Sequence, residues 1–412
     1  MTVSLNRLFS VRRFVARLLV GAAVAASGSA AKAQSFTGIG FLSGGTSSHA
    51  TNVSADASTV VGFASSPSGT RAIRWTREGG IESLGFIPGG LAGALAFGVS
   101  ADGSVVVGSC YPFAFRWTRA DGMQSLGRPP NSNLHAYAVS YDGSVVVGQV
   151  YIVRFPEKLA AYAAFRWTST GGLQVLPDLP DANNSGAFGV SGDGLVIAGR
   201  SGVEDGDQYT SRLARWTGAG DVEDLGTLPG SSLSGYAVSG DGLTIVGEAW
   251  SLDMGARAIR WTSAGGIQDI SDSVRSTARA VNHNGRVVVG DANNRAALWH
   301  PSLGRVDIDD YLFSHGIDTD GWMLSEAWGV SSDGLTIVGL GRNPQGLLEG
   351  WVATLPACPA DFNRDASVDS QDFFDFLTAF FVADPAADFN ADGVVNSGDF
   401  FAFLDAFFAG CA

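Results

Sequence analysis

The last part of the chain carries two short runs of oxygen-bearing side chains at matching spacing. In each run, Asp, Asn or Ser recurs at the first, third, fifth, ninth and twelfth places. Oxygens at this spacing form a loop suited to Ca²⁺, a hard cation that takes roughly six to eight oxygen ligands, with the seventh residue giving its backbone carbonyl. We therefore predict two calcium sites, formed by Asp361, Asn363, Asp365, Ser367, Asp369 and Asp372 and by Asp388, Asn390, Asp392, Val394, Asn396 and Asp399.

Each run leads into a phenylalanine-rich segment, at residues 373–381 and 400–408, that we expect to be a helix. This duplicated, EF-hand-like loop-and-helix unit resembles a type I dockerin, and the bracketing Cys358 and Cys411 resemble the cysteine-flanked, GC-type variant. The resemblance spans residues 358–411 and implies docking to a cohesin-like or other cell-surface protein. Asp at the twelfth place agrees with it. Ala366 stands where the sharp turn prefers Gly, so the first loop should bind calcium more weakly.

A region of this size has a small core, so we expect two Ca²⁺ ions and a Cys358–Cys411 disulfide to supply stability. Two interpretations of the region stay open. Calcium could serve stability alone, or the region could dock a partner. The number of phenylalanines exceeds what so small a core can bury, which favours docking.

Conventional catalytic motifs are absent from the sequence, which has no His-x-x-x-His, Gly-x-Ser-x-Gly or phosphate-loop pattern. The five histidines (His49, His135, His283, His300 and His315) are interpreted as surface or turn residues. Four segments depart from the repeat described next: 151–162, 203–209 (with Glu204, Asp205 and Asp207), 250–254, and 307–322 (with Asp309, Asp310, Asp318 and Asp320). Acidic pairs there could flank a glycosidic bond. A polysaccharide-degrading enzyme therefore remains an alternative to a non-catalytic binding or scaffold protein.

A motif recurs seven times at intervals of 40 to 51 residues. It consists of Val-Ser-x-Asp-Gly, with some substitutions, followed by a β-branched run that ends in Gly. Its Asp or Asn positions are Asp56, Asp102, Asp142, Asp193, Asp241, Asn284 and Asp333. Two further elements follow in each unit, an Ala-Ile/Phe-Arg-Trp-Thr stretch and a Leu-Gly-x-Leu stretch. We assign one strand before the Asp-Gly turn and three after it, the last being Leu-Gly-x-Leu. Turn chemistry accounts for the Asp and packing for the Arg-Trp pair, although some of these arginines could line a central channel.

Residues 34–356 are therefore predicted to be all-β, a seven-bladed propeller without helices. The last unit ends at residues 351–355 without its fourth strand, and a spare copy, residues 39–45, begins the mature chain, so this N-terminal strand should close the ring. The repeats resemble the HAF-family extracellular repeat over residues 36–356, which implies an extracellular propeller with no defined activity. The family's His is replaced, by Arg71, Phe113, Ala163, Arg212, Arg257 and Arg295.

Residues 1–33 read as an export signal. Basic residues lead into an apolar run too short to span a membrane, followed by Ala31-Lys-Ala33. We expect three parts: a signal peptide (1–33), the propeller (34–356) and the dockerin-like region (357–412). A net charge of −14 disfavours nucleic acid as a partner, and no later segment resembles a membrane span. We therefore expect a secreted or cell-surface protein with a glycan or protein ligand on the propeller. Cys110 is expected to be a small buried residue at a strand end.

Overall fold

The computed structural model describes residues 35–91, 93–154, 159–205, 208–218, 220–272, 275–301, 303–363, 368–390 and 392–409, with side chains omitted at 153–161 and 204–209. The predicted signal peptide, Asp365, Ser367, Asp207 and Cys411 lie outside these residues. Within them, no helix has the length and hydropathy required to cross a membrane.

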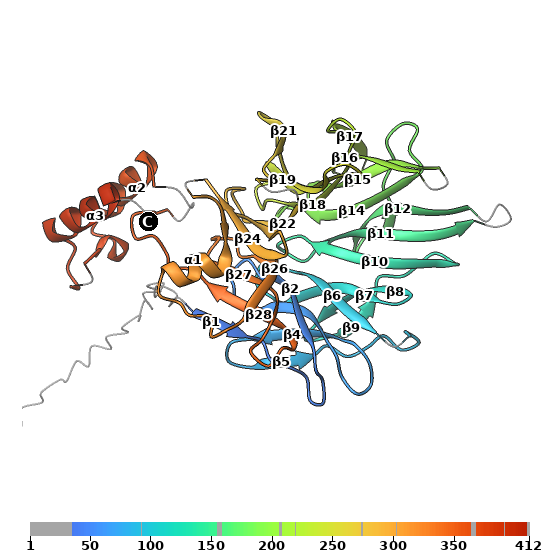
Figure 1. The fold of residues 1–412 in the computed structure, drawn as a ribbon, viewed down its shortest axis with the longest axis horizontal. Coiled ribbons are helices and arrows are strands. Elements are labelled where there is room, and N and C mark those ends of the chain that lie inside the picture. Colours follow the sequence, from blue (N-terminus) through green and yellow to red (C-terminus); the bar gives the residue numbers. More distant parts are fainter. Residues whose placement is uncertain are drawn as a thin grey trace, which may run out of the picture. The chain divides into compact units, whose positions relative to one another are not determined.

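Seven sheets of four antiparallel strands form the blades of a propeller (Figure 1), as the repeat predicts. The strands of each blade follow in order from the centre outward. Blade 1 consists of β2 (Ser48–Val53), β3 (Val60–Ala64), β4 (Arg71–Thr76) and β5 (Gly80–Ser83), and blade 2 of β6 (Ala94–Val99), β7 (Val105–Cys110), β8 (Phe113–Thr118) and β9 (Gly122–Ser125). Blade 3 consists of β10 (Ser132–Val139), β11 (Val145–Arg154), β12 (Leu159–Thr168) and β13 (Gly172–Val175), and blade 4 of β14 (Asn184–Val190), β15 (Val196–Asp205), β16 (Gln208–Thr217) and β17 (Asp221–Gly226). Blades 5 to 7 are β18 (Ser232–Val238), β19 (Thr244–Ser251), β20 (Gly255–Thr262) and β21 (Gly266–Asp269); β22 (Ser276–Val281), β23 (Val288–Ala292), β24 (Arg295–His300) and β25 (Gly304–Asp307); β26 (Met323–Val330), β27 (Thr336–Arg342), β28 (Leu348–Thr354) and β1 (Ser35–Gly38). The first strands of neighbouring blades contact one another around the full circle.

The ring closes through β1, which pairs antiparallel with β28. Closure by the N-terminal strand is confirmed, but the strand is Ser35–Gly38 and not the predicted 39–45 segment. The same displacement occurs elsewhere: β5 ends at Ser83, and Leu84 adds one further N–H···O bond, to Ala72, before Gly85 turns the chain at a φ of 85°. The Leu-Gly-x-Leu stretch is therefore mainly a crossing to the next blade, because a residue in the left-handed region cannot continue an extended strand. In blade 4, β17 does include the Leu-Gly pair.

The Ser-x-Asp-Gly turns have the hydrogen bonds that their residues suggest. In blade 2, the Ser100 hydroxyl donates to Asp102 (2.8 Å) and accepts from the Val105 N–H (2.9 Å). Gly103 adopts a φ of 70°, and Ala57 takes the equivalent conformation, at 61°, in the first repeat. The repeated Asp is thus explained by the turn.

The residue between Ser and Asp joins each turn to that of the next blade. Seven backbone N–H···O bonds of 2.9–3.3 Å run once around the ring: Asp56 to Ala101, Ala101 to Tyr141, Tyr141 to Gly192, Gly192 to Gly240, Asp241 to His283, His283 to Ser332, and Ser332 to Ala55. This circle of backbone hydrogen bonds ties all seven turns together at one face of the propeller.

Each first strand also contains a β-bulge two residues before its final Val. The bulged residues, which the pairing skips, are Thr51, Phe97, Tyr137, Phe188, Tyr236, Arg279 and Trp328. Opposite each bulge lies the Gly that ends the β-branched run: Gly62, Gly108, Gly148, Gly199, Gly247, Gly290 and Gly339. A Cβ at any of these seven would lie 1.9–2.0 Å from a carbonyl oxygen of the first strand. The repeated Gly therefore permits a close backbone approach at the bulge.

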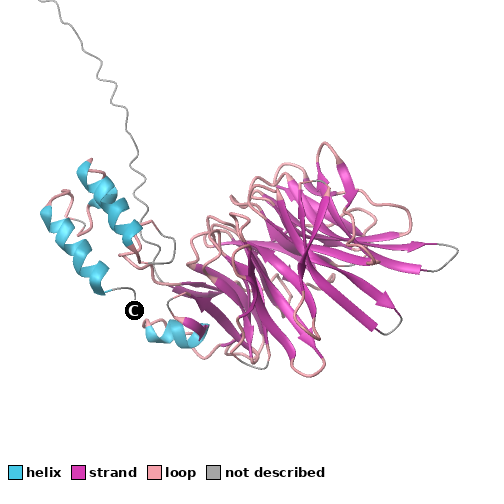
Figure 2. Cartoon of the chain, turned by 90° about the horizontal axis from the view of Figure 1, so that it is seen from above, coloured by secondary structure: helices cyan, strands magenta, loops and turns pink. Residues whose placement is uncertain are grey.

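One helix lies within the propeller segment, where the repeat predicted none. Helix α1 (Ile308–Ser314) connects β25 to β26 in place of the Leu-Gly-x-Leu crossing (Figure 2). Its Ile308 and Leu312 are fully buried in the cluster that also holds Trp351, so they supply the apolar contacts that the missing leucines make elsewhere.

After residue 357 the described chain is helical, as expected for the small second region. It contains α2 (Ser370–Phe381), the short 3-10 helix η1 (Pro385–Ala387) and α3 (Ser397–Ala409). Phe376 and Phe403 stack with ring centroids 4.1 Å apart at its centre and are fully buried. The two residues occupy the same place in the two copies of the repeat.

The bulge makes a prediction about Gly247. Gly247→Ala should lower the free energy of unfolding of the propeller by about 1–3 kcal/mol, because its Cβ would meet the Ser234 carbonyl. Gly220→Ala is the matched control, since a Cβ there has no neighbour within 4 Å and its φ is ordinary. Thermal or denaturant unfolding of both variants measures the difference. Equal stability of the two would contradict the close approach.

Candidate functional site

The seven bulged residues form a ring, here called the bulge ring, around the propeller axis. Four consecutive aromatic members contact one another, with centroid distances of 5.6 Å for Phe97–Tyr137, 5.2 Å for Tyr137–Phe188 and 6.1 Å for Phe188–Tyr236. Tyr137 and Phe188 line an axial cavity to which all seven blades contribute. Bulges redirect side chains, and here they create an aromatic arc in the central channel.

A second ring, here called the second-strand ring, lies farther from the turns. It consists of the residue after each bulge-facing Gly: Phe63, Ser109, Gln149, Arg200, Glu248, Asp291 and Leu340. Each pairs with the residue two places before the bulged one on its first strand. All seven residue types differ, although the flanking Gly is constant. The blades therefore differ in sequence at this position of the repeat.

Glu248 is the acceptor of two hydroxyl groups from neighbouring strands. Tyr236 of the bulge ring donates to Oε1 at 2.8 Å, and Thr277 of the next blade donates to Oε2 at 3.2 Å. Burial raises the pKa of Tyr236, with the Glu248 charge adding to the effect, so the phenol keeps its proton and remains a donor.

Arg279 is the bulged residue of blade 6 and connects two carboxylates. Its Nε donates to Asp291 at 2.8 Å, its Nη2 lies 3.8 Å from Glu326, and its guanidinium sits 4.1 Å from the Trp328 ring centroid. The Trp328 indole in turn donates to Glu326 at 2.7 Å. Burial raises the pKa of Asp291, and Arg279 opposes that shift. These contacts form a charged arc opposite the aromatic one.

Two of the five histidines, His49 and His135, are partly buried on first strands next to the bulge ring, so interpreting them as surface or turn residues was wrong. His283 does lie in a turn, as interpreted. His49 stacks on Phe63 at 4.3 Å, and His135 bonds Ser109 at 2.9 Å. Desolvation lowers the pKa of both, which favours the neutral imidazole at pH 7. Sequence spacing cannot show this, because the residues meet only once the ring closes.

The turn face of the channel is obstructed by Tyr141 and His283, which come from blades 3 and 6. Their rings lie 5.9 Å apart, and both line the axial cavity. Gly192 and Gly240 make room for them: a Cβ on Gly240 would lie 2.2 Å from each side chain. Together with the circle of backbone bonds, this pair narrows one end of the channel.

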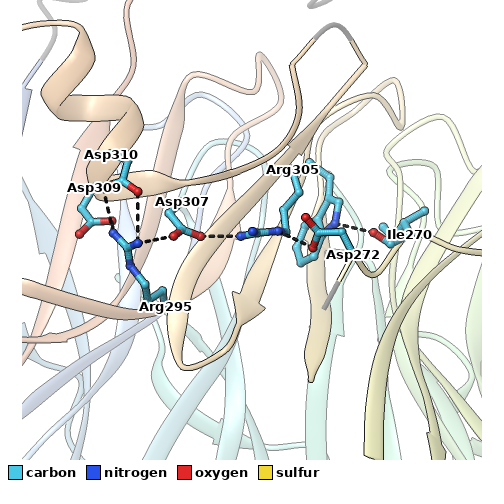
Figure 3. Close-up of polar contacts among 8 residues, drawn as sticks. Ile270, Asp272, Arg295, Arg305, Asp307, Asp309 and Asp310 are labelled. Atoms are coloured by element: carbon cyan, nitrogen blue, oxygen red, sulfur yellow. Dashed lines mark hydrogen bonds and ion pairs between the residues drawn. The ribbon is translucent and has the colours of Figure 1, made fainter. Parts of the chain in front are cut away.

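The acidic segment 307–322 was a candidate for a catalytic loop, and several of its carboxylates form ion pairs (Figure 3). Arg295 bonds Asp309 (2.6 Å), Asp310 (3.0 Å) and Asp307, and Arg305 bridges Asp307 and Asp272 at 2.5 Å each. Asp307 directly precedes α1, so the network fixes this helix to blade 6. Asp318 accepts from the Asp320 N–H and forms a turn. These acids support structure and do not surround a cavity.

The described residues of the remaining divergent segments lie mainly in paired strands. Residues 151–162 and 203–209 fall at the junctions of β11 with β12 and β15 with β16, where the side chains of Glu204 and Asp205 are among those omitted. In the β19–β20 hairpin, Trp250, Leu252 and Met254 are exposed by 47%, 89% and 44%. The β19–β20 hairpin thus presents apolar side chains to solvent.

The Arg-Trp pairs have a packing role, as predicted. Trp117, Trp216 and Trp261 are buried in successive clusters between blades. Their neighbouring arginines lie on third strands, where Arg215 bonds Glu223. The arginines that do reach the channel, Arg200 and Arg279, come from other positions of the repeat. Cys110 is buried at the end of β7, as expected.

The two oxygen-rich runs adopt the same backbone hydrogen bonds. Asp372 accepts from the N–H groups of Asn363 (3.1 Å) and Asp369 (2.9 Å), and Asp399 accepts from Asn390 (3.0 Å) and Asn396 (2.8 Å). These N–H donors lower the pKa of Asp399, that of Asn390 most. Both twelfth-place carboxylates are fully buried.

In the second run, Asp388 accepts from the N–H groups of Asp392 and Gly393, and Asn390 also accepts from Asp392. The Asn390 amide also donates to the Asp392 carboxylate at 3.1 Å, so the first, third and fifth side chains all make contacts within the same loop. Among the described residues, no three His, Cys, Asp or Glu side chains are grouped as a metal site, so calcium binding stays a prediction. So does the Cys358–Cys411 disulfide, because Cys411 lies outside the described residues.

No family model matches the chain, and no curated protein sequence matches it. Solved structures do. An oligogalacturonate lyase in complex with manganese has a TM-score of 0.53 at 12% identity, covering 78% of this chain and 93% of that one. The oligogalacturonate lyase of Vibrio parahaemolyticus gives 0.53 at 10%, with the same coverage. This chain shares their propeller fold. At such identities the likeness extends to the fold alone.

The charged arc makes a prediction about Arg279. Arg279→Met should destabilise the propeller at pH 7, because Asp291 and Glu326 lose their cation. The already raised pKa of Asp291 should rise further, so the loss should shrink as the pH falls towards that pKa and Asp291 becomes neutral. Thermal unfolding between about pH 7 and about pH 5 measures this.

Arg74→Met is the matched control, since its partner Glu82 is 41% exposed and the pair should contribute less than about 1 kcal/mol. Adding Asp291→Asn to Arg279→Met should recover part of the lost stability. A pH-independent loss in Arg279→Met would contradict the proposed coupling.

Proposed function

We propose that this protein is an exported, non-catalytic binding protein. Its propeller binds a glycan or protein ligand at the central channel, and its C-terminal region attaches it to an extracellular or cell-surface partner in a calcium-dependent manner. The observation that carries the binding function is the bulge ring. All seven repeats keep the bulge-facing glycine and six keep the tryptophan, yet the side chain at the bulge varies among them, and five of the seven bulged residues are aromatic.

Binding fits the channel better than catalysis because its acidic groups are already engaged. Glu248 accepts two hydroxyls, Asp291 pairs with Arg279, and Glu326 accepts the Trp328 indole. A general acid or base must be able to exchange a proton with a substrate at hydrogen-bonding distance. A set of groups that is already hydrogen-bonded in this way favours fixed geometry, as expected of a recognition site.

The proximity of these same carboxylates favours one alternative, a carbohydrate-active enzyme. Asp291 experiences the charges of both Glu326 and Glu248, so an acidic group gathers on one side of the channel. The experiment below separates the two functions.

The C-terminal region supports attachment through its exposed phenylalanines. Phe374, Phe381, Phe401 and Phe408 are exposed by 58%, 78%, 63% and 80%, while Phe376 and Phe403 fill the core. Exposed apolar residues of this kind favour a partner surface. With the duplicated loops, they support a dockerin-like module bound to a cohesin-like protein, alongside a HAF-type propeller.

The ligand chemistry of the second loop fits Ca²⁺. Its side-chain donors are all oxygens, and each oxygen of Asp399 that accepts one N–H keeps further lone-pair capacity. Asp388, Asn390, Asp392, Asn396 and Asp399, with the Val394 carbonyl, would hold the ion. Bound Ca²⁺ would offset the mutual repulsion of these carboxylates and fix the loop ahead of α3.

Retention on a panel of glycans and extracellular proteins tests the propeller. The mature chain should retain a ligand without generating new reducing ends or unsaturated products. Tyr137→Leu with Phe188→Leu should weaken retention about tenfold by removing aromatic faces while keeping apolar bulk. Phe86→Leu, an exposed aromatic outside the bulge ring, should have no effect. Product formation abolished by Glu248→Gln would replace the binding function with the enzymatic one.

Calcium removal tests the attachment region. Chelation should unfold residues 357–412 and abolish partner capture, while the propeller transition stays unchanged. Asp388→Asn with Asp399→Asn should reproduce this at saturating Ca²⁺, whereas Asp384→Asn, which caps η1 outside the runs, should not. Calorimetry with and without Ca²⁺ measures both transitions. If the unfolding transition of residues 357–412 did not change with Ca²⁺, this mode of attachment would be excluded.

A further inference from the structure

We infer that the channel ligand is an uncharged, polyhydroxylated ring compound, and specifically the terminal sugar of a neutral glycan chain. This inference rests on the proposed binding function and names its ligand. It follows from three features of the channel: the aromatic arc, the engagement of its charged groups in existing contacts, and its obstructed end.

The aromatic arc provides apolar ring faces, inclined to one another by 50–73°, and a single such ring is similar in width to a sugar ring. Phe97, Tyr137, Phe188 and Tyr236 form one continuous set of contacts on one side. A pyranose has an apolar face of C–H groups and a periphery of hydroxyls, so it can cover such rings while its hydroxyls point elsewhere. Removing the ring surface and the C–H face from water together is favourable.

The charged arc matches the hydroxyls and disfavours a full charge. The Arg279 cation is already shared between Asp291 and Glu326, and it also covers the Trp328 ring. Arg200 covers Phe188 at 5.5 Å. An ionic ligand would lose its hydration here and compete with these existing pairs. Carboxylate oxygens nevertheless retain lone pairs, and the Arg279 guanidinium has more N–H groups than its two carboxylate contacts use, so hydroxyls find both kinds of partner.

The obstructed end selects a chain terminus. Tyr141 and His283 project across the turn face, and Gly192 and Gly240 allow them to do so. The circle of backbone hydrogen bonds holds the seven turns around them. A polymer that threaded through the channel would have to displace these two side chains. We therefore expect the ligand to enter from the opposite face and to place one end against the bulge ring.

The strands that build the channel also fix its side chains in advance. Tyr236 is held by Glu248, and Trp328 is held by Glu326, both at hydrogen-bond lengths below 3 Å. Little side-chain freedom remains to be lost when a ligand binds, which helps a small neutral ligand achieve measurable affinity.

Titration calorimetry on the mature full-length chain tests the inference. The probes are linear neutral oligosaccharides, cyclic oligosaccharides of the same sugars, uronic acid oligosaccharides and a lysine-rich peptide. Linear neutral chains should bind, and cyclic ones, which have no end, should bind at least about tenfold more weakly. Raising NaCl from about 0.05 M to about 0.5 M should change the affinity by less than about twofold, because the neutral ligand carries no charge that salt could screen.

Variants connect this binding to the channel. Tyr137→Leu with Phe188→Leu should weaken binding about tenfold, and Glu248→Gln, which keeps the shape but loses the charge of an acceptor, about threefold or more. Glu82→Gln, which removes an exposed ion pair on blade 1, should leave binding unchanged. If the double variant unfolds, Glu248→Gln alone still tests the site.

The outcomes separate this inference from the proposed function. Equal binding of linear and cyclic sugars, or preference for the uronic or cationic probe with variant sensitivity, would overturn the terminal-sugar inference and leave a binding channel. Retention of a protein in place of any sugar would have the same meaning. Binding that neither Glu248→Gln nor the double variant alters would remove the channel from the proposed function altogether.

Discussion

In every blade, one carbonyl oxygen of the first strand approaches a glycine of the second strand so closely that no side chain fits between them. The approach accommodates a bulge, and the bulge turns one side chain per blade towards the propeller axis. The glycine is therefore constant, while the residue it liberates varies among Thr, Phe, Tyr, Arg and Trp. The structure thereby separates positions that build the ring from positions that can acquire function.

The propeller body could be predicted from the sequence because its signals are local and repeated. Asp-Gly turns, β-branched runs and buried tryptophans each depend on a few neighbouring residues, and their recurrence indicates the blade count and the closure. The outer strand was displaced in the prediction because Leu84 and its equivalents are apolar, as strand residues are. The following Gly at positive φ is the feature that ends the strand. After β25, helix α1 replaces this crossing. No other blade has such a helix in the described chain, so the repeat pattern could not predict it.

The channel could not be assembled from the sequence, since its members lie one per blade and tens of residues apart. One signal was nevertheless present. A glycine inside a β-branched run indicates a bulge or a close backbone approach, and residues opposite seven such glycines would have been the channel candidates. The acidic residues at 307–310 suggested a catalytic loop because they are close together in the sequence. In the structure they form ion pairs with Arg295 at the start of α1.

The strand order of blade 7 has a mechanical consequence. The chain leaves the propeller through β28, which lies between β27 and β1 and is hydrogen-bonded on both sides. If the C-terminal region is tethered while the channel holds a ligand, tension enters the propeller through this doubly bonded strand and not through a sheet edge. Separating β28 from the sheet would require the hydrogen bonds to both β27 and β1 to break together. Pairing with the N-terminal strand therefore strengthens the propeller at the point where the force is applied.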